Sequence, residues 1–270
     1  MYTDRRHLIS FTAALVVVAG ACVEHTPLES GASTIVIHAV LNGAVRNQYV
    51  VVQRTVNGNP VAAAVSGATV TITAPGGIVM TATEDHDSSA VQVAAGDPAI
   101  SLVYLISLDQ YGVNLVPGGT YQLHVHLPTG EDVTGSTTIP NASPLSTPAA
   151  NATFWSTVDT LRLTWVPVPG ASSYEVRISS TASTYALFAD SAVALPGTLR
   201  GLNGTDVFTA GLTNQVVVSA VDGNYYAYYR TNSDPFTGAT VVGNLSGAVG
   251  VFGSLVELVV QNLNVIGGTP

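Results

Sequence analysis

The chain has 270 residues, of which 47% are hydrophobic and 9% are charged, and its formal net charge is −9. The hydrophobic fraction is large enough to fill a core, which argues against a disordered chain. All eight basic residues are arginine, and so acidic a chain offers no basic stripe for phosphate backbones, which argues against nucleic acid as a partner.

The N-terminus predicts a bacterial export signal. Arg5 and Arg6 form a positive region, and an apolar run follows from Leu8 to Val18. A membrane span needs about 20 apolar residues, and this run has about half that length, as in a signal peptide. We therefore expect residues 1–21 to be removed. They hold two of the 8 basic and one of the 17 acidic residues, so the mature chain has six basic and sixteen acidic residues and a net charge of −10.

The only cysteine, Cys22, stands directly after Ala19-Gly20-Ala21. This run resembles a lipobox, although lipoboxes more often carry leucine where Ala19 stands. The alternative is ordinary secretion with a leftover thiol, but a free reactive cysteine in an exported protein would be exposed to oxidation. We therefore predict that Cys22 is lipidated and that residues 22–32 form a tether.

Lipidation at Cys22 predicts stable membrane attachment, because two or more acyl chains hold a protein where one chain does so only marginally. Val23 follows the cysteine in place of the aspartate that usually retains lipoproteins at the inner membrane. We therefore expect a lipid-anchored protein of the bacterial cell envelope, at the outer membrane.

Strand patterns fill residues 33–140. β-Branched or alternating runs separated by turn dipeptides indicate short strands, and they occupy residues 33–41, 48–54, 68–73, 78–83 and 121–127. In the last run Tyr121, Leu123, Val125 and Leu127 share one face, and Gln122, His124 and His126 share the other. Such alternation is typical of an antiparallel sheet buried on one side, so an Ig-like β-sandwich is expected at 33–140.

A proline-rich linker is predicted at 141–152 and a second β domain at 153–270. Strand signals recur at residues 161–166, 173–179, 214–221 and 254–260. The stretch "LRLTWVPVPGASSYEVRI", with Trp165 and Tyr174, resembles strands B and C of fibronectin type III domains. The expected fold class is all-β, with two Ig/fibronectin III-like sandwiches in tandem.

The stretch Asp222–Thr231, "DGNYYAYYRT", is ambiguous. A strand would put Tyr226 and Tyr228 on one face, whereas a helix would stack Tyr225 over Tyr229. We favour a short helix.

Two groups of side chains are candidate sites. Tyr225, Tyr226, Tyr228, Tyr229 and Trp155 would form a stacking platform for a sugar or peptide; alternatively, these rings fill the core and the seam between domains. His124 and His126 share a strand face and would bind a metal ion with a third ligand; alternatively, they are polar residues on a solvated face.

Motifs for other chemistry are weak. Gly243, Gly247, Gly250 and Gly253 do not have the spacing of a phosphate-binding loop, so we interpret them as bulges or close backbone approaches. The acidic stretch 84–87 lacks the register of a calcium loop and is expected to be a solvated loop. The sequence contains no G-x-S-x-G motif and no distinctive catalytic set. We expect no enzymatic activity and no cofactor.

Several motifs together resemble one family. They are "VIHAVLN" (36–42), "YVVVQRT" (49–55), "VSGATVTIT" (65–73), "LVPGGTYQLHV" (115–125), "NYYAYYR" (224–230) and "GNLSGAVGVFGSL" (243–255). In this order after a lipobox, they resemble the envelope lipoproteins known as domain of unknown function 4249. The resemblance implies an outer-membrane lipoprotein that often accompanies TonB-dependent transporters, and it implies no catalytic residues.

The function predicted from the anchor and the resemblance is a non-catalytic accessory or ligand-binding role beside a TonB-dependent nutrient transporter. The alternative is a structural or adhesive surface protein with no small ligand, because Ig-like and fibronectin-like sandwiches often serve as spacers.

Overall fold

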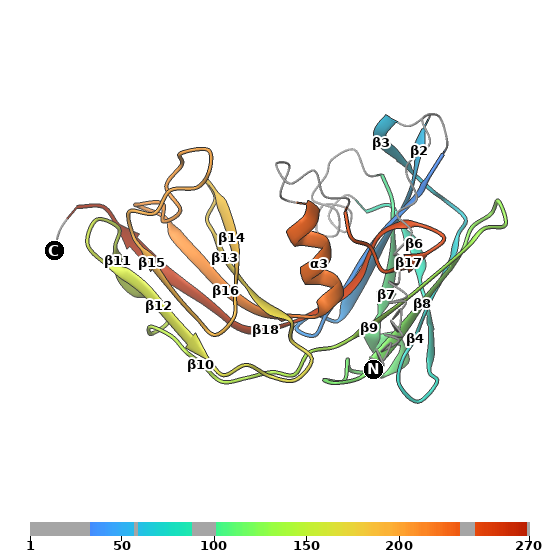
Figure 1. Ribbon diagram of the computed structural model, residues 1–270, viewed down its shortest axis with the longest axis horizontal. Coiled ribbons are helices and arrows are strands. Elements are labelled where there is room, and N and C mark those ends of the chain that lie inside the picture. The colour runs from blue at the N-terminus through green and yellow to red at the C-terminus, as the bar shows by residue number, and fades with distance from the viewer. Residues whose placement is uncertain (1–32, 57–58, 88–100, 233–240, 269–270) are drawn as a thin grey trace, which may run out of the picture.

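The computed structural model describes residues 33–56, 59–87, 101–232 and 241–268, and these are nearly all in strands (Figure 1). The expected all-β class with sandwich-like sheets is confirmed. The strands up to residue 138 are β1 (Ile35–Asn42), β2 (Asn47–Val56), β3 (Asn59–Ala64), β4 (Thr69–Thr73), β5 (Val79–Thr81), β6 (Thr83–Asp85), β7 (Val103–Ser107), β8 (Thr120–His126) and β9 (Asp132–Thr138), with one short helix, α2 (Leu108–Tyr111).

The remaining elements contain the second series of strands and one longer helix. They are β10 (Leu145–Ser146), β11 (Ala152–Trp155), β12 (Thr160–Trp165), β13 (Ser173–Ser179), β14 (Thr184–Ala189), β15 (Ala192–Pro196), β16 (Thr213–Val221), α3 (Gly223–Asn232), β17 (Leu245–Ser246) and β18 (Val249–Ile266). Among the described residues no helix is long and apolar enough to cross a membrane.

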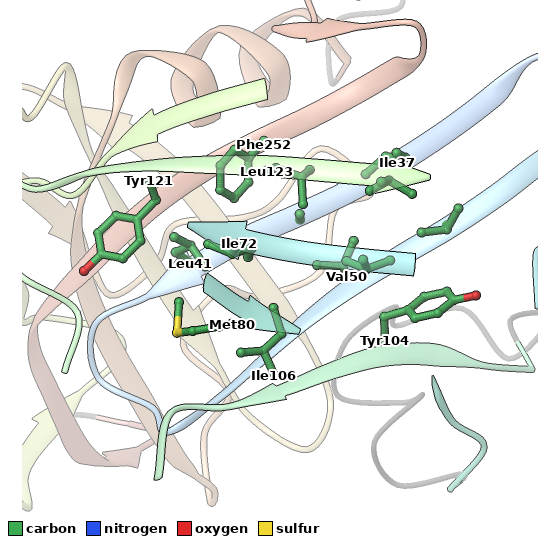
Figure 2. Packing of buried hydrophobic residues seen from close by; sticks show 14 of the residues in the cluster. Ile37, Leu41, Val50, Ile72, Met80, Tyr104, Ile106, Tyr121, Leu123 and Phe252 are labelled. Atoms are coloured by element: carbon green, nitrogen blue, oxygen red, sulfur yellow. The ribbon is translucent and has the colours of Figure 1, made fainter. Parts of the chain in front are cut away.

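The first lobe is a sandwich of two sheets. A five-stranded sheet in the order β17-β9-β8-β4-β5 faces the β1, β2, β7 and β6 part of a ten-stranded sheet. Alternate residues of β1 and β8 are buried, and Figure 2 shows Ile37, Ile72 and Leu123 projecting into the shared core. The period-2 pattern of the sequence therefore sets which face each strand buries.

The second lobe packs the other end of the ten-stranded sheet, in the order β14-β13-β16-β18, against a three-stranded sheet in the order β10-β12-β15. Its core contains Trp165 and Tyr174, whose ring centroids lie 5.1 Å apart. The Tyr174 hydroxyl accepts a hydrogen bond from the Val168 N–H at 2.8 Å. These contacts hold the corner between β12 and β13, within the stretch that resembles strands B and C of fibronectin type III domains.

Strand β18 belongs to both lobes. Its residues 249–255 pair in parallel with β1, and residues 255–264 pair antiparallel with β16. Phe252 is buried in the core of the first lobe, whereas Leu263 and Val265 are buried in that of the second. Residues 153–270, expected to form the second domain, thus also supply β17 and half of β18 to the sandwich of residues 33–140.

Helix α3 lies between the two lobes, against β18 where the sheet curves (Figure 1). Of the two interpretations of 222–231, the helix is confirmed. The register of β16 on β18 shifts between Val218 and Ser219, close to where the sheet bends beneath this helix. Bulges increase the local bend and twist of a strand, so this irregularity helps the sheet curve around α3.

Candidate functional site

Asp222 starts helix α3. Its carboxylate Oδ1 accepts the Tyr225 N–H at 2.9 Å, and its carbonyl oxygen accepts the Tyr226 N–H at 3.1 Å. A capping aspartate satisfies N–H groups that the first turn leaves unpaired. This cap, together with packing on β18, keeps four tyrosines in a helix although tyrosine is a mediocre helix former.

Tyr225 and Tyr229 stack on the side of α3 that faces the sheet. Their ring centroids lie 4.3 Å apart, as the helical interpretation predicts. Tyr225 is buried beside Val221 and Leu255. The Tyr229 hydroxyl lies 2.6 Å from His38 Nε2 on β1. These two rings therefore pack in the seam between the lobes.

Burial shifts the pKa values of the titratable side chains in this seam. It lowers the pKa of His38, which favours the neutral imidazole, and it raises the pKa of Tyr229 to about 12. The Tyr225 hydroxyl donates to Glu175 Oε2 at 3.1 Å, and Arg177 Nη2 lies 2.6 Å from the same oxygen. Glu175 is buried, so the guanidinium and the phenol supply the partners that a buried carboxylate requires.

Tyr226 and Tyr228 remain half-buried on α3. The edge of Phe188 from β14 meets the Tyr226 ring, with centroids 5.1 Å apart. The Arg230 guanidinium stands 5.7 Å from the centre of the Tyr226 ring and donates to its hydroxyl at 3.2 Å. Tyr226 therefore lies with Phe188 and Arg230 on one side of α3, whereas Tyr228 lies beside His38 of β1, with ring centroids 6.1 Å apart.

Trp155 does not join these tyrosines. It ends β11, where it pairs with Ile266 at the far end of β18, whereas Tyr225 contacts the β18 backbone at Gly253. Of the residues predicted for a stacking platform, the structure therefore brings together the four tyrosines of α3 but not Trp155. Strand β11, which ends at Trp155, lies in the second lobe, away from α3 (Figure 1).

A buried polar network joins the start of α3 to the first lobe. Asp222 Oδ2 accepts the Thr137 hydroxyl at 2.7 Å, and Oδ1 accepts the Ser254 N–H at 3.1 Å. The amides of Asn224 and Asn244 both donate to the carbonyl oxygens of Ser136 and Phe252. Sequence analysis missed this network; its one local signal is an aspartate that follows the apolar run of β16 and precedes a helix.

The same network lines a polar pocket of about 290 Å³ at the N-terminus of α3. Its walls include Ser136, Thr138, Asn224 and Asn244. Burial raises the pKa of the Asp222 carboxyl, against the lowering effect of the hydrogen bonds that it accepts. Because its polar groups bond to one another, we interpret the network as the joint that fixes the start of α3 on the first lobe.

His124 and His126 lie on the exposed face of β8, as predicted. His124 Nε2 and His126 Nδ1 each lie 2.9 Å from Asp132 Oδ1 on β9. Hydrogen bonds from His126 and His124 lower the pKa of Asp132. Within the described ranges no group of three or more His, Cys, Asp or Glu is arranged to hold a metal ion, and a metal at these histidines stays a prediction.

The glycines of 243–253 allow close backbone approaches, as the sequence indicated. A Cβ on Gly250, at φ +116°, would clash with the Ile37 carbonyl oxygen of β1. A Cβ on Gly243 would lie 2.6 Å from the Gly250 carbonyl oxygen. Only glycine fits at such positions.

Contrary to the sequence prediction, the acidic stretch 84–87 is not a loop throughout, because Glu84 and Asp85 belong to β6. Glu84 accepts the Ser66 hydroxyl and the Gly67 N–H, and the Gly67 bond is the largest cause of its lowered pKa. Cys22 lies outside the described residues.

The model of a family described as a domain of unknown function (DUF4249) matches residues 24–258. No curated protein matches the chain. Among solved structures, the FN1–FN3 domains of chicken CNTN1 are 11% identical, with a TM-score of 0.20, over 88% of this chain and 68% of that chain. A Ca²⁺-stabilised adhesin with which an Antarctic bacterium binds ice is 16% identical, with a TM-score of 0.21, over 90% of this chain and 51% of the adhesin chain.

Proposed function

The chain belongs to the DUF4249 family, and from this membership, the predicted lipid anchor and the geometry of α3 we propose that it is a non-catalytic binding protein held on the bacterial envelope. It serves as the accessory or ligand-binding component of an outer-membrane, TonB-dependent nutrient transporter. The sequence supports the anchor and the transporter in this proposal, and the fold supports the binding surface.

The observation that carries this proposal is the group of aromatic rings that α3 holds between the lobes, where half-buried Tyr226 lies beside Phe188 and Arg230, and half-buried Tyr228 lies beside His38. Aromatic rings offer contact area at a low cost in conformational entropy, and they stack on the apolar faces of sugars and on peptides. The Asp222 network fixes the first turn of the helix. The rings are therefore positioned before a ligand arrives, which lowers the entropic cost of binding.

Glycan and peptide arrays test the binding role. We expect a saturable ligand for the wild-type protein and at least a tenfold loss of affinity in the Y226A/Y228A double variant. Tyr49→Ala on β2, another half-buried tyrosine in a strand of the first lobe, is the matched control and should bind as the wild type does. Blank arrays, or equal binding by the double variant, would contradict the proposal.

Mass spectrometry of protein made in a bacterium tests the anchor. We expect a mature N-terminus at Cys22 carrying acyl chains, and an unacylated, freely diffusing product in the Cys22→Ser variant. Affinity purification from detergent-solubilised membranes tests the transporter, which should co-purify with the wild type. An acyl-free wild-type chain, or isolation without a transporter, would refute that part.

A structural or adhesive role is the second candidate, and one feature favours it. The ten-stranded sheet runs through both lobes, so in the part of the chain that the structure describes the lobes are joined by continuous strand pairing along β18. A stiff spacer needs such continuity. Adhesion of cells to surfaces, unaffected by the tyrosine substitutions and lost on deletion of the gene, would support this role over ligand uptake.

A further inference from the structure

Strand β14 is an open edge of the ten-stranded sheet. It pairs with β13 on one side, and the sheet ends there. Its sequence, TYALFA, has no charge and no proline. Such an edge presents backbone N–H and C=O groups that another strand can pair with.

The register identifies which groups face outward. The Ser180 N–H donates to the Ser183 carbonyl oxygen at 2.8 Å, and hydrogen-bonded and non-hydrogen-bonded pairs alternate along the antiparallel ladder from there. Thr184, Ala186 and Phe188 therefore point their N–H and C=O groups away from β13. Across the described residues, no hydrogen bond to these outward groups is found.

The other strands at the ends of the sheets are protected by the usual devices. Four of them have only two or three residues: β5, β6, β10 and β17. The fifth, β15, has five residues and ends in Pro196. Two strands lie off the main path of the ten-stranded sheet and also have a single partner strand: β3 contains a proline, and β11 has only four residues. Short length and proline both discourage pairing with another chain. With six residues and neither charge nor proline, β14 lacks these protections.

A groove of about 460 Å³ lies beside this edge. It runs between β14 and the loop 201–207, and Tyr185, Leu202 and Val207 contribute its apolar surface. Leu202 is fully exposed. No residue that lines the groove is charged. A strand added to β14 would project alternate side chains into this groove.

We propose that the outer edge of β14 and this groove bind an extended peptide segment of a partner protein, which adds to the sheet as a further strand. The segment has uncharged, alternately apolar residues at its centre, matching the uncharged groove. Asp190, exposed directly after β14, favours a basic residue at the end of the segment that lies beside it.

A second copy of this chain is the disfavoured occupant. Two mature chains, each with a net charge of −10 (six basic and sixteen acidic residues), repel one another. The loop 201–207 also stands beside β14, so a second sandwich would have to clear it, whereas a single peptide strand fits alongside. This proposal goes beyond the aromatic site on α3, because it uses another surface and does not require Cys22 to be lipidated.

A random 12-residue peptide library displayed on phage is the probe, selected against the mature chain. The strongest clone is then synthesised, and its affinity is measured for the wild type, Ala186→Pro and Ala186→Ser. Proline removes one outward N–H without touching the bonds to β13, whereas serine keeps that N–H. We expect alternately apolar clones, at least tenfold weaker binding to A186P, and binding to A186S within about twofold of wild type.

Amide hydrogen exchange provides a test that needs no variant. Adding the peptide should slow exchange at the N–H groups of Ala186 and Phe188 in the wild type. The proposal fails if no clone is selected, if A186P binds equally while melting as the wild type does, or if exchange at these amides is unchanged. It also fails if sedimentation shows a dimer of this chain that A186P dissolves, because the edge would then belong to a second copy. These readouts are independent of the Y226A/Y228A experiment.

Discussion

Replacing Asp222 by alanine should destabilise the protein by disconnecting the start of α3 from the first lobe. The substitution removes the cap on the Tyr225 N–H and leaves the buried Ser254 N–H without its acceptor. The Thr137 hydroxyl keeps Ser254 Oγ as a neighbour at 2.9 Å, so its loss is smaller. A lost cap costs about 1 kcal/mol and an unsatisfied buried donor about 1–3 kcal/mol, so D222A should cost roughly 2–4 kcal/mol.

Asp222→Asn is the matched control. The amide oxygen can still accept both backbone N–H groups, and its NH₂ can donate to Thr137 Oγ1, so we expect a change below about 1 kcal/mol. Urea unfolding and thermal melting measure both variants. With about 2–4 °C per kcal/mol for a chain of this size, D222A should lower Tm by roughly 4–16 °C. Equal losses in D222N and D222A, or no loss in either, would refute this account of the joint.

The charge of Asp222 also predicts a pH effect. Burial raises its pKa in the folded state above the unfolded value. The folded state therefore holds this proton more tightly, and the Asp222 contribution to stability falls as the pH rises from the unfolded pKa through the raised folded pKa. Asparagine does not titrate, so D222N lacks this component. The free energy of unfolding of the wild type should therefore fall relative to that of D222N as the pH rises over that range. A difference independent of pH would contradict it.

Three further predictions concern other contacts. Tyr225→Phe removes the hydrogen bond to the buried Glu175 and should cost about 1.5–3 kcal/mol in urea unfolding; an unchanged midpoint would count against that bond. Gly250→Ala places a Cβ against the backbone of β1 and should lower the free energy of unfolding by about 3 kcal/mol or more in the same urea experiment. A variant as stable as the wild type would contradict this close backbone approach. His126→Gln should raise the pKa of Asp132 toward its ordinary value, because His126 is the largest cause of its lowering; carboxyl-carbon NMR titration would show no change if the hydrogen bond were absent.

Local patterns in the sequence predicted many strands and their buried faces. In β8, Tyr121, Leu123 and Val125 are buried and the residues between them are exposed, as the alternation indicated. The sequence missed β9, "DVTGSTT", because its outward and inward residues are small and polar and only Val133 marks the apolar face. It also missed β14, an edge strand whose half-exposed residues follow no sharp alternation.

By itself, then, the sequence determined the all-β class and the family, and it favoured the helical stack of Tyr225 on Tyr229, because each follows from residues close together in the chain. Only the tertiary structure decided that β18 serves both lobes, that Asp222 meets Thr137 and Ser254, and that Trp155 lies apart from α3. Strand partners are chosen by packing between distant segments, as in the bond from Asn42 to Glu257 across 215 positions. No local period of hydrophobicity encodes that choice.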